Sequence, residues 1–319
     1  MTDNAVTDDK VHVVEEAQRV RAPMETVYGL VADVIGWTQH FHPAVHAEYV
    51  SRCENEDVVR QWSLAGEDGV RVWTVRRRLD PAGRITFVHE PPAPPATDVR
   101  GEWLFTTDGP DVTEVRMRHE FQVAGGAPVA GPIAENIRAN TLRYLAALAD
   151  TAQRKAEVDE LTVSFEDSLV IDGPIEAVYA YLYAADRWPE RIPHVTRLDL
   201  RESTPNVQFF DMDTKAADGS IHTTRSVRIC QPPNLIVYKQ IRLPDQLDAH
   251  TGHWKFTQTA EGVIASARHT ATIKRSALPL KSPGETPAGA RRYVRKVLSA
   301  NSMSNLRLAK RFAEEQAGG

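Results

Sequence analysis

An internal repeat constrains this chain more than any other feature of its sequence. Residues 22–37 (APMETVYGLVADVIGW) and 173–188 (GPIEAVYAYLYAADRW) align without a gap at an offset of 151 residues. The same offset aligns the segment beginning Gly101-Glu-Trp with the segment beginning Gly252-His-Trp. A period of this length indicates two copies of a whole domain rather than a solenoid of short units. We therefore expect one domain over residues 1–156 and a second over residues 157–319.

Composition limits what these two domains can do. A chain of 319 residues has room for two domains that each bury a core of their own. Its two cysteines, Cys53 and Cys230, exclude a disulfide scaffold and a cysteine-rich zinc module. The net charge of -5 argues against partnership with nucleic acid or anionic lipid. No apolar run approaches the ~20 residues that span a bilayer, and the polar, acidic start does not resemble a secretory signal. We expect a cytoplasmic protein that acts on a small molecule, without a membrane or nucleic-acid partner.

Both copies predict the same order of elements. A strand (11–20 and 161–171) leads to a proline and a first helix (about 24–35 and 175–186), and a short second helix ends near Pro43 or Pro193. Several strands separated by turn signals follow, and then a long helix. In the first copy this helix carries an apolar stripe, and in the second the stripe fades beyond Met303. The order predicts an α+β fold in which a curved antiparallel sheet wraps around the long helix and leaves an interior cavity.

Strand alternation predicts which side chains face that cavity. In residues 72–79 the inward set includes Trp73 and Arg77, and the offset carries it to a more polar set in the second copy, namely His222, Thr224, Ser226, Arg228 and Cys230. A buried arginine is costly without an anionic partner or a water-filled cavity. The two inward arginines are therefore candidate catalytic residues. The alternative is an arginine paired with a carboxylate such as Glu25 or Glu176.

Other aromatic and histidine residues share the inward phase. Trp103 and Trp254 are candidates for the cavity wall, with plain core packing as the alternative. For His119 and His269 we favour histidines satisfied within the core. His40, His42 and His46 lack the fixed spacing of a metal site, so no metal is expected.

The chain resembles the di-domain aromatase/cyclases of bacterial type II polyketide synthases, which belong to the START-like, helix-grip superfamily. The likeness rests on the Pro-x-Glu-x-Val-Tyr helix start, Trp37 and Trp188 at the helix ends, the strand with Arg77 or Ser226-Val-Arg228, and the later tryptophans. It implies two tandem helix-grip domains that bind a poly-β-ketone carried on an acyl carrier protein. It also implies regiospecific aldol closure of the first ring and dehydration to an aromatic ring, without a cofactor.

The resemblance also implies site residues. It assigns Arg77, Arg228 and Ser226 to catalysis and Trp37, Phe41, Trp103, Trp188 and Trp254 to substrate binding. The inward stripe adds His222 as a candidate catalytic residue and Trp73 as a candidate substrate-binding residue, and Tyr238 is a further substrate-binding candidate. The first domain departs from the family pattern, because Val75 stands where the serine is expected. Both copies also lack a tyrosine that single-domain relatives carry after the second helix. The candidates for the proton-transfer group are therefore His222, His40 and Tyr238.

Two alternatives stay open. The superfamily also includes lipid carriers and hormone receptors, so the rival hypothesis is a non-catalytic carrier or sensor of an apolar small molecule. A carrier would have an almost wholly apolar lining, whereas His222, Ser226 and Arg228 favour chemistry. A division of labour is compatible with catalysis: the polar second pocket would dehydrate, and the tryptophan-rich first pocket would fold the chain.

Overall fold

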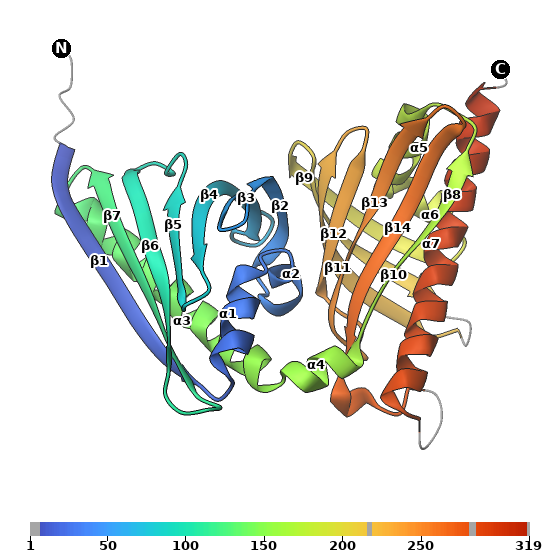
Figure 1. The fold of residues 1–319 in the computed structure, drawn as a ribbon. Coiled ribbons are helices and arrows are strands. Elements are labelled where there is room, and N and C mark those ends of the chain that lie inside the picture. The colour runs from blue at the N-terminus through green and yellow to red at the C-terminus, as the bar shows by residue number, and fades with distance from the viewer. Residues whose placement is uncertain (1–6, 216–218, 281–284, 318–319) are drawn as a thin grey trace, which may run out of the picture. The chain divides into compact units, whose positions relative to one another are not determined.

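The computed structural model describes residues 7–215, 219–280 and 285–317, and it divides into two compact units (Figure 1). The first unit comprises Met1–Ser63 and Arg71–Lys155, and the second comprises Leu64–Val70 and Ala156–Gly319. We call them the first and second domains. The predicted boundary between residues 156 and 157 falls within helix α4 (Lys155–Leu161) and stays a prediction.

The first domain is a seven-stranded antiparallel sheet with a long helix, ordered β1-β7-β6-β5-β4-β3-β2. Its elements are β1 (Thr7–Val20), α1 (Met24–Ala32), α2 (Trp37–His40), β2 (Ala44–Arg52), β3 (Glu56–Leu64), β4 (Val70–Asp80), β5 (Arg84–His89), β6 (Ala96–Thr107), β7 (Thr113–Ala124) and α3 (Ala127–Gln153).

The second domain repeats this arrangement, with strand order β8-β14-β13-β12-β11-β10-β9. Its elements are β8 (Thr162–Ile171), α5 (Ile175–Tyr183), a 3₁₀ turn (Ala185–Arg187), α6 (Trp188–Arg191), β9 (Val195–Thr204), β10 (Val207–Lys215), β11 (Ile221–Gln231), β12 (Leu235–Arg242), β13 (Leu247–Thr259), β14 (Gly262–Ile273), a 3₁₀ turn (Arg275–Ala277) and α7 (Pro287–Ala317). The predicted α+β fold with a duplicated sheet and long helix is confirmed.

The same local signals start the equivalent helices. Pro23 and Pro174 stand directly before α1 and α5, where the missing N–H and restricted φ of proline are tolerated. Glu25 and Glu176 lie in the first turn, where a carboxylate interacts favourably with the positive end of the helix dipole.

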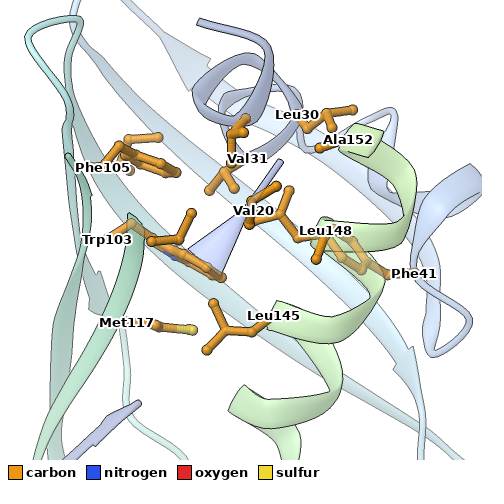
Figure 2. Packing of buried hydrophobic residues seen from close by; sticks show 14 of the residues in the cluster. Val20, Leu30, Val31, Phe41, Trp103, Phe105, Met117, Leu145, Leu148 and Ala152 are labelled. Atoms are coloured by element: carbon orange, nitrogen blue, oxygen red, sulfur yellow. The ribbon is translucent and has the colours of Figure 1, made fainter. Parts of the chain in front are cut away.

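The core of the first domain lies between α3 and the sheet. Figure 2 shows Leu145 and Leu148 of α3 near Trp103 and Met117, and all four side chains belong to one buried cluster. Leu145 and Leu148 are 1% and 0% exposed, as the predicted stripe requires. Burial of such side chains contributes roughly 1.5–3 kcal/mol each.

Helix α7 corrects one expectation about the second domain. Its buried face does not fade beyond Met303, because Leu306, Ala309 and Ala313 continue it with 0% exposure. Alanines escape a search for large apolar residues, yet they allow close packing. An added Cβ on Gly173 would lie 3.0 Å from the carbonyl oxygen of Ala313. No helix among the described residues is long and apolar enough to cross a membrane.

Candidate active site

One transverse row of residues crosses the inner face of the second sheet. Gln208, Arg228, Tyr238, Gly252 and His269 are successive Cα partners on β10 through β14. Partners directly opposite in antiparallel strands share a face, so strand pairing gathers these residues from five segments of the sequence.

Arg228 is the most unusual group in this row. Its side chain is buried, with 1% exposure, and its Nη2 donates to the Leu182 carbonyl at 2.9 Å. Its Cζ lies 5.3 Å from the Trp188 ring centroid and 5.9 Å from that of Phe210. Nε and Nη1 are buried without an oxygen or nitrogen acceptor among the described residues, and the neighbouring Cys230 thiol interacts with the guanidinium. Burial lowers the pKa of the guanidinium, because the charged form loses solvation.

The carboxylate that acts electrostatically on Arg228 is Glu202, and it is bound to other groups. It accepts hydrogen bonds from the Tyr183 hydroxyl at 2.5 Å, and from Gln208 Nε2 and the Asn206 backbone N–H at 2.8 Å. Burial raises the pKa of Glu202, but these hydrogen bonds outweigh it and lower the pKa overall. Arg228 forms no ion pair in the described part of the chain, so its charge is not neutralised by direct contact.

Arg77, the equivalent residue of the first domain, is fully paired. Its Nε and Nη2 donate to the two carboxylate oxygens of Asp57 at 2.8 and 2.7 Å. Nη1 and Nη2 also donate to the carbonyls of Val31 and Ala32 at 3.1 and 2.9 Å, so each guanidinium nitrogen has an acceptor. This is the carboxylate-paired alternative, but its partner is Asp57. The expectation of Glu25 or Glu176 as partner was wrong, because both glutamates lie on exposed first turns of their helices.

A buried hydrogen-bonded cluster continues from Tyr238 across the second sheet. The Tyr238 hydroxyl lies 2.7 Å from His269 Nδ1, and His250 Nε2 lies 3.1 Å from the same nitrogen. His250 Nδ1 in turn lies 2.9 Å from Gln240 Oε1. Burial lowers the pKa of His250 to about 3 and that of His269 to about 4, so both rings are neutral near neutral pH.

His269 is satisfied on one side of the ring only. Its Nε2 is buried without a partner in the described part of the chain, and so is Nδ1 of His119 in the first domain. The expectation of two fully satisfied core histidines was therefore wrong. Burial also raises the pKa of the Tyr238 hydroxyl, which keeps its proton.

Gly252 makes the contact between Tyr238 and His269 possible. These two residues come from β12 and β14, with β13 between them. A Cβ added to Gly252 would lie 2.3 Å from the Tyr238 hydroxyl oxygen, so the tyrosine occupies space that any other residue would fill. Gly101 plays the same part under Phe87 in the first domain, with 2.6 Å between its added Cβ and Phe87 Cζ.

Two other candidate catalytic residues occupy different parts of β11. Ser226 is buried and lies opposite Gln240, in the row next to Arg228. His222 lies at the start of the strand with its Nε2 3.1 Å from the Ser220 hydroxyl. Six residues of extended strand separate His222 from Arg228 by about 20 Å, so these two side chains do not meet.

The first domain contains a small hollow with a cavity volume of about 10 Å³, the space of about one water molecule. Its wall combines Trp37 and Trp73 with Trp62, Tyr144 and His46. Phe41 lies behind this wall, with its ring centroid 5.3 Å from that of Trp37 and 5.1 Å from that of Tyr144. The hollow therefore brings together two of the predicted substrate-binding tryptophans.

The later tryptophans lie in the cores. Trp103 stacks on Phe105 at a centroid distance of 6.4 Å, and Trp254 is 6% exposed within the main core cluster of the second domain. Their packing matches the structural alternative, and a role in binding substrate stays a prediction. Trp188 instead contacts Arg228 through its ring. No set of three or more His, Cys, Asp or Glu residues within the described ranges is arranged to hold a metal ion.

Several site residues were not predicted, although the repeat contained a signal for three of these positions. The offset of 151 residues aligns Asp57 with Gln208, a carboxylate with an amide, and Val99 with His250. Where one copy has an apolar or charged side chain and the other has a polar side chain of a different kind, the two sites differ. Trp62 carries the same signal, because the offset aligns it with Asp213. Tyr144 lies on the long helix, and packing against the sheet brings it into the hollow.

Comparison with known families agrees with this geometry. Residues 11–156 and 171–292 each match a family model described as "Polyketide cyclase / dehydrase and lipid transport". A granaticin polyketide synthase bifunctional cyclase/dehydratase of Streptomyces violaceoruber is 40% identical over 95% of both chains. The actinorhodin polyketide synthase bifunctional cyclase/dehydratase of Streptomyces coelicolor is 38% identical over 93% of this chain and 96% of the relative.

Solved structures extend the agreement to the whole chain. The di-domain ARO/CYC StfQ of the steffimycin pathway is 48% identical with a TM-score of 0.83, covering 96% of this chain and 100% of that one. The di-domain ARO/CYC BexL of the BE-7585A pathway is 38% identical with a TM-score of 0.84, covering 95% and 99%. The chain therefore belongs to the polyketide cyclase/dehydrase family. The prediction of aromatase/cyclase function is confirmed at this level.

Proposed function

We propose that the chain closes and aromatises the first ring of a poly-β-ketone, with the chemistry centred on Arg228 of the second domain. An acyl carrier protein presents the substrate, as the resemblance implies. The observation that carries the proposal is the buried guanidinium with two donors and no acceptor. A buried cation of this kind is matched to an anion that forms during the reaction.

Arg228 supplies electrostatic stabilisation. Removal of a proton from an acidic methylene of the substrate places negative charge on an enolate oxygen, and the aldol step moves charge to an alkoxide. Fixed donors that point at such oxygens in a dry site lower the barrier, because no solvent must reorganise. Nε and Nη1 of Arg228 are donors of this kind.

Tyr238 and His269 form the proton-transfer pair. Of the three candidates, Tyr238 alone is the Cα partner of Arg228, and its hydroxyl contacts the neutral His269 at 2.7 Å. A neutral imidazole accepts a proton, and the phenol donates one to the departing hydroxyl. Loss of water then yields the aromatic ring.

The first domain binds and folds the neutral part of the chain. Its hollow is lined by aromatic rings, and its arginine is already paired with Asp57. Holding a flexible chain so that two chosen carbons meet lowers the reaction barrier through proximity. The gain is at most ~7–11 kcal/mol.

The test is reconstitution with a minimal polyketide synthase, with and without a ketoreductase, followed by mass spectrometry of the products. We expect spontaneous shunt products to give way to one aromatic first-ring product. Arg228→Gln should reduce that product by about 10²–10³-fold, as loss of an oxyanion donor does. The matched control is Arg84→Gln on the exposed face of β5, whose ion pair with Glu102 is at the surface.

An unchanged product profile with the wild-type protein would contradict the proposal. If the protein then retained an apolar compound from the mixture, the carrier hypothesis would replace it. The mixture that responds, reduced or unreduced, identifies the form of the substrate.

A further inference from the structure

We infer that one exchange between the copies, Asp57 in the first domain for Gln208 in the second, decides which domain binds an oxyanion. The inference rests on the proposed function only for the identity of that anion, an enolate. Gln208 is a positioning residue that keeps the Arg228 guanidinium available to bind an anion.

The two positions are structurally equivalent. Asp57 and Arg77 lie on the adjacent strands β3 and β4, and Gln208 and Arg228 lie on the adjacent strands β10 and β11. Gln208 and Arg228 are direct Cα partners. The offset of 151 residues relates each pair to the other. The carboxylate of Asp57 accepts two hydrogen bonds from Arg77, so the first guanidinium is neutralised within the fold.

Gln208 cannot neutralise Arg228, and it also holds the neighbouring carboxylate. Its side chain is buried, with 1% exposure. Nε2 donates to Glu202 at 2.8 Å and to the Tyr183 carbonyl at 3.3 Å, and Oε1 has no donor among the described residues. The amide of Gln208 thus holds the Glu202 carboxylate on the edge strand β9 by a hydrogen bond. The Arg228 guanidinium has no carboxylate in direct contact among the described residues.

A tryptophan beside Arg228 differs from its first-domain equivalent in the same direction. Trp37 donates its indole N–H to the Leu30 carbonyl at 2.9 Å, whereas the indole nitrogen of Trp188 is buried without an acceptor in the described part of the chain. The hydroxyl of Tyr179 is also buried without an oxygen or nitrogen partner in the described ranges, and both the Cys230 thiol and the charge of Arg228 act on it. Unpaired buried donors are rare in proteins, so their concentration around one cation indicates a ligand that accepts hydrogen bonds.

The chemistry of these donors defines the ligand class. Arg228, Trp188 and Tyr179 offer N–H and O–H groups flanked by aromatic rings, which suits a planar anion with its charge delocalised onto oxygen. Enolates of β-ketones and phenolates belong to this class. A carboxylate at position 208 would compete with such an anion, because a buried ion pair is strongly held once its partners are desolvated.

The test compares Gln208→Asp with Gln208→Asn, two variants that differ in charge and have the same size. The probe is para-nitrophenol, whose phenolate is coloured, so binding of the anion appears as a fall in the apparent pKa of the dye. Wild type and Gln208→Asn should bind the phenolate, and Gln208→Asp should bind it at least about tenfold more weakly, a loss of ~1.4 kcal/mol. Arg228→Gln should abolish binding even though Arg77 is intact. Thermal unfolding of each variant verifies that it is folded.

The outcomes separate the inference from the proposed function. Equal phenolate binding by Gln208→Asp and Gln208→Asn, or binding that survives in Arg228→Gln, overturns the inference. Product analysis of the same variants with the minimal synthase tests the function independently. Charge-dependent phenolate binding without any change in products would uphold the anion site and reject the proposed reaction.

Discussion

Arg77 and Arg228 occupy equivalent positions, and yet their chemical states differ. Arg77 is 4% exposed and gives its donors to Asp57 and two carbonyls. Arg228 is 1% exposed and donates to a single carbonyl, and two of its nitrogens have no acceptor among the residues that the structure describes. Duplication preserved the residue and the strand, while one exchange on the neighbouring strand changed what the residue can do.

The difference teaches how to separate a structural arginine from a functional one. Both are buried, so burial alone does not discriminate between them. A buried cation whose hydrogen bonds are all satisfied stabilises the arrangement of its partners, and removal of one partner is costly. A buried cation with free donors carries a desolvation penalty that a ligand can offset. Three experiments test this distinction.

The largest expected effect is on the stability of the first domain. Asp57→Asn leaves the Arg77 charge buried without a counter-ion, and we expect the free energy of unfolding to fall by about 3–5 kcal/mol. Four of the six tryptophans lie in this domain, so urea unfolding monitored by tryptophan fluorescence reports on it. The double variant Asp57→Asn/Arg77→Gln removes both charges and should recover most of the loss. A single-variant cost below ~1 kcal/mol would show that the pair is not structural.

An effect that is small near neutral pH and grows in acid concerns the histidine cluster of the second domain. His250 and His269 have folded-state pKa values of about 3 and about 4, below the unfolded value near 6.5. The unfolded chain therefore binds more protons below about pH 6.5, so stability is complete above that pH and falls as the pH drops toward about 4. Each histidine contributes up to ~1.4 kcal/mol per pH unit within this window.

Urea unfolding across that pH range measures the effect, and His250→Gln serves as the comparison. The variant keeps a polar side chain without a titrating ring, so its stability should depend less on pH. If wild type and His250→Gln lose stability in parallel, the cluster does not titrate as described.

The smallest expected effect on the free energy of unfolding comes from removing one hydroxyl of the second domain that the first domain lacks. Tyr238→Phe removes the hydroxyl that contacts His269, and Phe87 already occupies the equivalent position opposite His119. We expect a loss of ~1 kcal/mol in unfolding free energy, the usual net contribution of one hydrogen bond. Phe87→Tyr is the reciprocal variant, because Nδ1 of His119 lacks a partner. A loss above ~3 kcal/mol from Tyr238→Phe would indicate that the ring, and not the hydroxyl, is disturbed.

Much of the fold and part of the site could be predicted from the sequence. The repeat predicted two domains of the same α+β fold, and alternation along one strand placed Arg77, Ser226 and Arg228 on buried positions. These predictions succeeded because they depend on local periodicity and on comparison of a chain with itself. The buried face of α7 beyond Met303 was not predicted, because alanine gives a weak apolar signal although it packs closely.

The aligned repeat already contains the difference between Asp57 and Gln208 at equivalent positions. The state of each arginine was decided only by the tertiary structure. Register between neighbouring strands places Gln208 opposite Arg228, and the packing of α5 directs the Leu182 carbonyl at its Nη2. Such pairings join residues far apart in the chain, so no local pattern encodes them. Whether a buried charge is neutralised depends on these distant partners, and that is why the two copies differ in chemistry while they share a fold.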